Sequence, residues 1–173
     1  MKYIELKNGI KTKVDDRDYL RLSQYKWYFQ RYKASGYVVR SLKKNGKRVL
    51  RSMHRMILDA PIGTEVDHKD GDGLNNQRSN LRLCTHQQNG FNQGTQRRKK
   101  SSKYKGVYWQ KTIGKWIAKI KYNGKMHHIG CYINGIAAAQ AYDKEARKHF
   151  GEFARPNNPR SLPYEEIDGL PKL

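Results

Sequence analysis

The chain of 173 residues carries 36 Lys and Arg against 15 Asp and Glu, which gives a formal net charge of +21. An excess of positive charge this large predicts a polyanionic partner, and nucleic acid is the leading candidate. A membrane surface fits less well, because the sequence has no basic amphipathic helix, no apolar run near the ~20 residues of a membrane span and no signal-peptide core at its N-terminus. We therefore expect a cytosolic or nuclear protein, with neither a membrane nor a small-molecule partner.

The first half of the chain is typical of β structure with short helices. The Asn8–Gly9 pair lies between two short strands, which is a hairpin signal. Asp15 or Asp16 is expected to cap a helix, and turns at Gly36 and Asn45–Gly46 separate three further strands. The expected elements are strands 3–6 and 11–14, a helix at 15–25, strands 27–32, 36–42 and 47–53, and a short helix at 54–58.

The next segment, residues 65–92, concentrates acids, amides and histidines in a strand–loop–strand–helix unit. The expected parts are a strand at 65–68, a loop at 69–80, a strand at 81–85 and a helix that begins at 86. Neighbouring strand residues face opposite sides, so Asp67 and His68 can serve one site only if the strand ends there. The Lys-Asp-Gly-Asp-Gly run that follows makes that ending plausible.

This segment carries the residue types of metal-assisted phosphodiester hydrolysis. The Asp67 carboxylate and the Asn89 amide are hard oxygen ligands, which suit Mg²⁺ and also Mn²⁺. The His68 imidazole can take a proton from water, since its pKa lies near working pH. Its ring must be oriented through the other nitrogen, by the Asn80 side chain or by a backbone carbonyl.

Two other interpretations concern the loop itself. An EF-hand calcium loop is excluded, because Leu74 and Leu81 stand at its fifth and twelfth positions, counted from Asp70, where ligands are required. A plain polar loop remains the competing interpretation on chemistry alone. In either case several polar side chains are expected to satisfy loop backbone groups, namely Asp70, Asp72, Asn75 and Asn76.

The stretches MHRMI and GTEVDHKDGDGLNNQRSNLRLCTHQQN resemble the HNH endonucleases of phage and intron type, whose ββα-metal site cuts DNA. The resemblance implies that Asp67 is a metal ligand, His68 the general base, Asn80 the residue that orients this base and Asn89 the second metal ligand. His54 would then be packed beneath the site. His86 would contact phosphate or a leaving group, or remain a solvated helix residue.

The run QRRKKSSK has no apolar residue, and it is typical of a solvated linker or of an arm that lies along phosphates. It divides the chain into an expected nuclease domain at 1–96, a linker at 97–103, a second domain at 104–157 and a tail at 158–173. The expected phosphate contacts of the linker are Arg97, Arg98, Lys99 and Lys100.

The second half has the pattern of a three-stranded antiparallel sheet followed by one helix. The expected strands are 104–112, 114–122 and 124–132, and the expected helix runs from Asn134 to Gly151. The helix should cover a core made of Val107, Trp109, Trp116, Ala118, Ile120 and Ile129. The opposite face would carry Tyr108, Gln110, Ile117, Lys119, Lys121 and His128. Such a basic face suits the major groove of DNA, although lysines also keep an exposed sheet soluble.

The stretches YKGVYW, GKWIAKI, HHIGCY and AAAQAYDKEARKHFGEFARPN resemble the APETALA/ethylene-response-factor DNA-binding domain over about 53 residues. The resemblance implies its fold, but the sheet face departs from the plant pattern. For example, Lys119 stands where the plant family has Glu. The plant recognition sequence is therefore not expected to apply.

The two cysteines, Cys84 and Cys131, form no CxxC pair, which disfavours a thiolate zinc site and a disulfide scaffold. We expect both to be small buried residues. The sequence as a whole predicts an α+β protein: a β-rich region that leads into a ββα-metal unit, followed by the small sheet and its helix. The predicted activity is metal-dependent cleavage of double-stranded DNA by a monomer, with a dimer as the alternative. A DNA-binding regulator with an inactive nuclease unit, an RNA-binding protein and a nucleoid protein are the competing classes.

Overall fold

The computed structural model describes residues 1–7, 9–32, 35–94 and 101–158. Small antiparallel sheets and a few helices make up the described chain, so the predicted α+β class is confirmed. Two compact units divide between Gln93 and Gly94; the sequence predicted the end of the first domain at residue 96. No helix within the described ranges is long and apolar enough to cross a membrane.

The first unit opens with a hairpin, in which β1 (Lys2–Glu5) pairs antiparallel with β2 (Lys11–Val14). Alternation along these strands turns Ile4, Thr12 and Val14 inward, and all three are buried. Gly9 has a φ of +76°, as the tight turn requires, whereas Asn8 lies outside the described residues. Helix α1 (Asp16–Ser23) follows and packs against β1.

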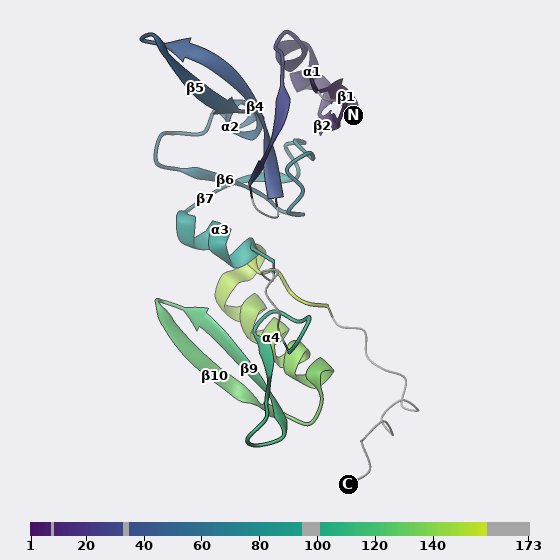
Figure 1. Ribbon diagram of the computed structural model, residues 1–173, viewed down its shortest axis with the longest axis vertical. Coiled ribbons are helices and arrows are strands. Elements are labelled where there is room, and N and C mark those ends of the chain that lie inside the picture. The colour runs from purple at the N-terminus through teal and green to yellow at the C-terminus, as the bar shows by residue number, and fades with distance from the viewer. Residues whose placement is uncertain (8, 33–34, 95–100, 159–173) are drawn as a thin grey trace. The chain divides into compact units, whose positions relative to one another are not determined.

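A meander of three strands comes next, in the order β3 (Tyr28–Tyr32), β4 (Ser35–Lys44) and β5 (Lys47–Ser52). Strand β3 pairs only with the first half of β4, up to Val39. Beyond that point β4 and β5 form a two-stranded hairpin that extends away from the rest of the unit (Figure 1). Its turn is Asn45–Gly46, where both residues have positive φ values of 49° and 73°.

The third part of this unit is the strand–loop–strand–helix segment predicted from the sequence. Helix α2 (Met53–Ile57) leads into β6 (Glu65–His68), β7 (Leu81–Cys84) and α3 (His86–Asn92). The register of β6 and β7 pairs Asp67 with Arg82 and His68 with Leu81. Thr85 begins α3 with a capping box, in which its side chain and that of Gln88 each bond the other residue's backbone.

A single hydrophobic core joins these parts. Trp27, only 1% exposed, lies in it and donates its indole N–H to the carbonyl of Leu22 at 2.8 Å. Such a bond satisfies the polar end of a buried Trp. The other buried members are Ile4, Leu6, Val14, Leu22, Val38, Met53, Ile57, Val66 and Leu81.

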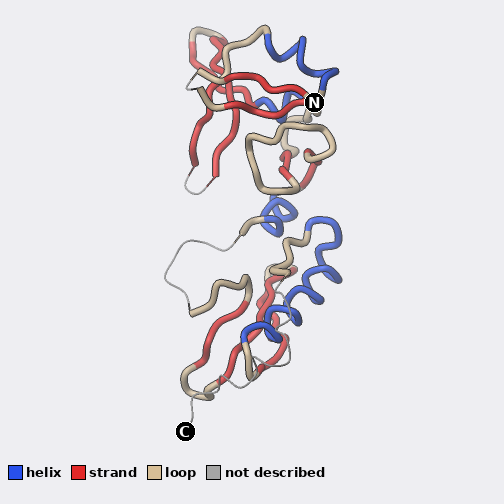
Figure 2. Tube along the Cα trace, turned by 90° about the vertical axis from the view of Figure 1, so that its right-hand side faces the viewer, coloured by secondary structure: helices blue, strands red, loops and turns tan. Residues whose placement is uncertain are grey.

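The second unit is a three-stranded antiparallel sheet with one helix on it. Its strands are β8 (Val107–Gln110), β9 (Lys115–Tyr122) and β10 (Lys125–Tyr132), with β9 in the centre. Helix α4 (Gly135–Phe150) runs along the sheet (Figure 2) and is followed by η1 (Gly151–Phe153). Asn134 caps α4 as predicted, since its side chain accepts a hydrogen bond from Ala137 N at 2.7 Å.

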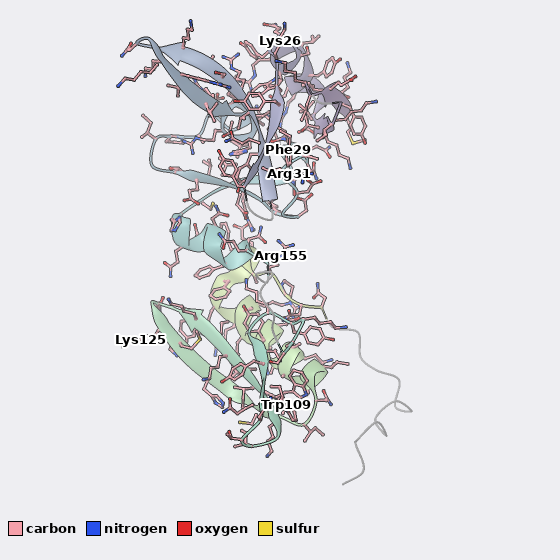
Figure 3. All side chains as sticks on the ribbon, viewed as in Figure 1. Lys26, Phe29, Arg31, Trp109, Lys125 and Arg155 are labelled. Carbon is pink, nitrogen blue, oxygen red and sulfur yellow. The ribbon has the colours of Figure 1, made fainter. Side chains whose placement is uncertain are left out.

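Three details of this unit differ from the sequence prediction. Trp109, predicted in the core, is 36% exposed, because it lies near the end of the short edge strand β8 and contacts Trp116 edge-on. Ile117, predicted on the open face, is 4% exposed, because it lies in the central strand between Tyr108 and Cys131. Cys131 is exposed on the edge strand β10, whereas Cys84 is buried as expected. Figure 3 shows Trp109 and Lys125 at opposite ends of the sheet.

Candidate active site

Asp67 and His68 end strand β6, and both side chains are almost fully buried. Arg82, opposite Asp67 in the strand pair, donates its Nε and Nη2 to Asp67 Oδ2 at 2.9 and 2.6 Å. Because a guanidinium is always charged, this charge-assisted pair fixes the orientation of the buried carboxylate. The register of β6 and β7 therefore prepares an anionic oxygen pair at the end of the strand.

The amide of Asn92, at the end of α3, lies directly against Asp67. Its Nδ2 is 3.0 Å from each carboxylate oxygen of Asp67, 2.8 Å from the carbonyl oxygen of His68 and 3.4 Å from that of Lys69. An amide has only two N–H bonds, so four oxygens around one nitrogen exceed what it can satisfy. Converging carboxylate and carbonyl oxygens are the donors that Mg²⁺ and other hard cations take.

The sequence prediction placed Asn89, rather than Asn92, beside Asp67. In the structure Asn89 Nδ2 donates to Glu65 Oε2 at 2.6 Å, and His86 Nδ1 lies 2.7 Å from Glu65 Oε1. These hydrogen bonds hold the pKa of Glu65 below its usual value. The structure thus brings Asn89 and His86 together on Glu65, and it brings Asn92 to Asp67. Residues three apart on a helix are neighbours on its surface, so the spacing of the two asparagines does not by itself show which of them meets Asp67.

Three side chains surround the imidazole of His68. Asn76 Oδ1 lies 3.3 Å from His68 Nε2. The Tyr37 ring stacks on the His68 ring with centroids 5.8 Å apart, and the His54 ring meets it edge-on at 5.1 Å. Burial lowers the pKa of His68, although the Asn76 hydrogen bond and the nearby carboxylates act in the opposite direction. At neutral pH the ring is therefore uncharged and able to accept a proton.

Asn80, predicted to orient His68, directs its side-chain hydrogen bonds into the loop. Its Nδ2 donates to Asp70 Oδ1 at 2.9 Å and to the carbonyl of Asn75 at 2.8 Å, and its Oδ1 accepts from Asp70 N at 3.1 Å. The side chain within hydrogen-bond distance of the His68 ring is Asn76, which was expected only to satisfy loop backbone groups. Its position in the loop gives no periodic signal that would have identified it.

His54 lies beneath the site, as predicted. It is 6% exposed, and its ring contacts both His68 and Tyr37 edge-on, with centroids 5.1 and 5.0 Å apart. Burial, together with the charges of His68 and Arg55, lowers the pKa of His54 to about 3. His54 is therefore neutral and fills the space behind the general-base candidate.

The loop at residues 69–80 packs against the β3–β5 meander at Gly73. A Cβ added at Gly73 would lie 1.8 Å from the carbonyl oxygen of Gly36 and 3.4 Å from the Tyr37 ring. Only glycine allows this approach, because the obstructing atom is backbone. The contact explains how Tyr37, from the first half of the chain, reaches the ring of His68.

Among residues 1–7, 9–32, 35–94 and 101–158, no group of three His, Cys, Asp or Glu side chains could hold a metal ion. A cation at Asp67 would therefore rely on one carboxylate, amide and backbone oxygens, and water. Magnesium is bound in this way, with few protein ligands and several retained waters. The donor set at Asp67 therefore fits a hard divalent ion.

The predicted DNA-facing residues of the second unit lie on the sheet face opposite α4. Lys119 Nζ is 5.4 Å from the centroid of the Tyr108 ring, and His128 Nε2 is 3.7 Å from the sulfur of Cys131. Gln110 is engaged with Thr112 at 3.0 Å, and Lys121 is exposed. The predicted phosphate contacts of the linker, Arg97, Arg98, Lys99 and Lys100, lie outside the described residues.

Comparisons with known proteins agree with this geometry. A model of the HNH endonuclease family matches residues 59–91, which span the strand–loop–strand–helix segment up to the residue before Asn92. An uncharacterized HNH endonuclease of Acanthamoeba polyphaga mimivirus is 39% identical over 138 residues, which cover 79% of this chain and 68% of that protein. The chain therefore belongs to the HNH endonuclease family, and it is a DNA nuclease.

Two further relatives match parts of the chain. Protein 3.8 of Escherichia phage T7 is 33% identical over 95 residues, which cover 55% of this chain and 77% of that protein. Dehydration-responsive element-binding protein 2D of Arabidopsis thaliana is 44% identical over 64 residues, which cover 36% of this chain and 31% of the plant protein. No solved structure gives a significant match.

Proposed function

We propose that this nuclease is a divalent-metal-dependent endonuclease of the phage and homing type, which hydrolyses phosphodiester bonds at preferred sites in duplex DNA. The observation that carries the proposal is the convergence of oxygens from Asp67, His68 and Lys69 on the side-chain nitrogen of Asn92, in the same segment that carries the His68 imidazole. Enzymes of the HNH family generally depend on a divalent metal, and Mg²⁺ suits an all-oxygen donor set best, with Mn²⁺ as an alternative.

Asp67 would hold the metal, and an amide oxygen from α3 would complete the protein's contribution. Asn92 is the nearer candidate by its contacts with Asp67, and Asn89 is the candidate that the family motif implies. A bound divalent ion would neutralise charge on the scissile phosphate and stabilise the leaving oxygen. Arg82 would keep the Asp67 carboxylate oriented through its two hydrogen bonds.

His68 would act as the general base. Its neutral imidazole has one nitrogen beside Asn76, which leaves the other to take the proton of the attacking water. Asn80 would contribute by bracing the loop through Asp70 and Asn75. His86, paired with Glu65 on an exposed surface, would be free to reach a phosphate only when that pair separates.

DNA affinity would come from basic surfaces in both units. The second unit resembles a plant DNA-binding domain, which the partial plant match supports, and its open sheet face carries Tyr108, Gln110, Lys119, Lys121 and His128. In the first unit the hairpin of β4 and β5 carries exposed Lys43, Lys44, Lys47, Arg48 and Arg51. These cations would bind phosphates and contribute little sequence specificity. Recognition of the bases would then depend on the open sheet face of the second unit.

The test is incubation of the purified full chain with supercoiled plasmid in Mg²⁺ and in EDTA. Open circles or linear DNA that form only with the metal would support the proposal, and their ratio would distinguish nicking from double-strand cleavage. One site per monomer favours nicking. Tight duplex binding without any cleavage across several DNAs would instead favour a DNA-binding regulator with an inactive nuclease unit.

A further inference from the structure

The orientation of the Asn76 amide is fixed by its neighbours. Its Nδ2 donates to the backbone carbonyl of Gly73 at 3.2 Å and to the hydroxyl of Thr12 at 2.9 Å. A carbonyl oxygen only accepts, so the amide atom beside Gly73 must be the NH₂ group. The oxygen of Asn76 consequently faces His68, because turning over this amide, only 1% exposed, would set its oxygen against the carbonyl oxygen of Gly73.

This orientation determines the protonation pattern of His68. Asn76 Oδ1 can accept a hydrogen bond but cannot donate one, so the neutral imidazole must carry its proton on Nε2. The lone pair then lies on Nδ1, which is the nitrogen available to take a proton from water. A histidine held in the opposite tautomer would present an N–H to the water and could not act as its base.

Thr12, from the N-terminal hairpin, completes the chain of hydrogen bonds. Its hydroxyl donates to the carbonyl of Leu74 at 2.7 Å and accepts from Asn76 Nδ2, although 62 and 64 positions separate these pairs in the sequence. Thr12 is fully buried. A valine would fill the same volume without burying a hydroxyl, and a buried hydroxyl costs free energy unless it is bonded.

Backbone bonds hold the hairpin and the loop in this register. Lys13 N donates to the carbonyl of Leu74 at 2.9 Å, and Asn76 N donates to the carbonyl of Lys13 at 2.9 Å. Thr12 is therefore presented to Asn76 by β2, and Asn76 is presented to His68 by the loop. The side chains and the backbone define one connected path from the hairpin to the imidazole.

We propose that Thr12 and Asn76 are positioning residues that set the tautomer of His68, which makes the N-terminal hairpin part of the catalytic machinery. The proposal rests on the proposed role of His68 as general base. It predicts that cleavage depends on a hydroxyl which contacts neither DNA nor metal.

The direct test is the tautomer itself, measured on the metal-free wild-type chain by long-range proton–nitrogen NMR correlations of the imidazoles. The His68 signals are assigned by their absence in a His68→Gln variant. The proposal requires a neutral ring with its proton on Nε2. A proton on Nδ1 would overturn it, whatever the activity of the enzyme.

The second test compares Thr12→Val with Thr12→Ser. Valine removes the hydroxyl and keeps the volume, so kcat should fall about tenfold while KM and DNA affinity stay unchanged, as expected for one lost hydrogen bond in a positioning chain. Serine restores the hydroxyl and should recover the lost rate. Equal kcat values for wild type and a folded Thr12→Val variant would refute the proposed role of Thr12 as a positioning residue. Failure of the wild type itself to cleave would refute the proposed function, yet the NMR result would still decide the tautomer.

Discussion

Asn92 donates its side-chain amide to both carboxylate oxygens of Asp67, at 3.0 Å each, across the junction of α3 and β6. The two residues are 25 positions apart, and the contact depends on the turn at Thr85 that begins the helix. This contact places the neutral side-chain amide of Asn92 where oxygens of Asp67, His68 and Lys69 converge. The same amide can present its oxygen to a cation after a rotation about its last side-chain bond.

The two asparagines of α3 can be separated by their effect on metal binding. Because Asn92 contacts Asp67 and Asn89 contacts Glu65, Asn92→Ala should weaken Mn²⁺ affinity on the order of 10- to 100-fold and Asn89→Ala should weaken it less. Isothermal titration calorimetry with Mn²⁺ measures both, with Asp67→Asn as the reference for loss of the site. A larger loss in Asn89→Ala than in Asn92→Ala would return the ligand role to Asn89.

Acid sensitivity should follow from Asp18, a buried carboxylate to which no catalytic role is assigned. Burial disfavours the charged form of Asp18, but hydrogen bonds and charges from Arg78 and Arg21 outweigh it and lower its pKa below the usual 3.8. A lowered folded-state pKa gives stability that is present above the unfolded pKa and is lost as the pH falls through the folded one. Asp18→Asn should therefore lower the free energy of unfolding by about 2 kcal/mol at pH 7.

Urea unfolding at pH 7 and below pH 3.8 measures this effect, because the difference between Asp18→Asn and wild type should shrink in acid. Asp59→Asn is the matched control, since the Asp59 side chain is 80% exposed and 3.8 Å from Arg21. A constant difference across this pH range would show that packing, not ionisation, makes Asp18 important.

Cysteine modification offers a probe of the open sheet face. Cys131 is exposed beside His128, whereas burial and the charges of Asp67 and Glu65 raise the pKa of the Cys84 thiol to about 11. The thiolate is the reactive form, so a maleimide should label Cys131 and spare Cys84. If the face contacts DNA, labelling should weaken duplex binding about tenfold, or about 1.4 kcal/mol.

Fluorescence anisotropy with labelled duplex DNA measures that loss, and Cys131→Ser should make binding insensitive to the reagent. Unchanged affinity after complete labelling of Cys131 would remove this face from DNA binding.

The parts of the fold that depend on local pattern were predictable from the sequence. The hairpin around Asn45–Gly46, the strand that ends at His68 and the helix capped by Asn134 all follow from turn residues, alternation and capping. The α+β class followed from the order of these elements. The helix that begins at His86 was also predicted, and the structure shows the capping box of Thr85 and Gln88 at its start.

The contacts that depend on tertiary structure were not predictable. The register of α3 decides that Asn92, not Asn89, meets Asp67, and a seven-residue helix gives too little periodicity to fix its rotation. The bond from Asn76 to Thr12 joins segments 64 positions apart, and only the docking of loop on hairpin creates it. The position of the Asn80 side chain was not predictable either, because its amide donates to Asp70 rather than contacting the His68 imidazole.

The measurement that tests the central claim most directly is plasmid cleavage by wild type and His68→Ala in Mg²⁺, with duplex affinity measured on both proteins. The imidazole acts on water, so His68→Ala should lose cleavage by at least about 100-fold and keep duplex affinity within a few-fold of wild type. Cleavage by His68→Ala at the wild-type rate would contradict the assignment of His68 as the general base. A parallel loss of binding and cleavage would instead make His68 a structural residue.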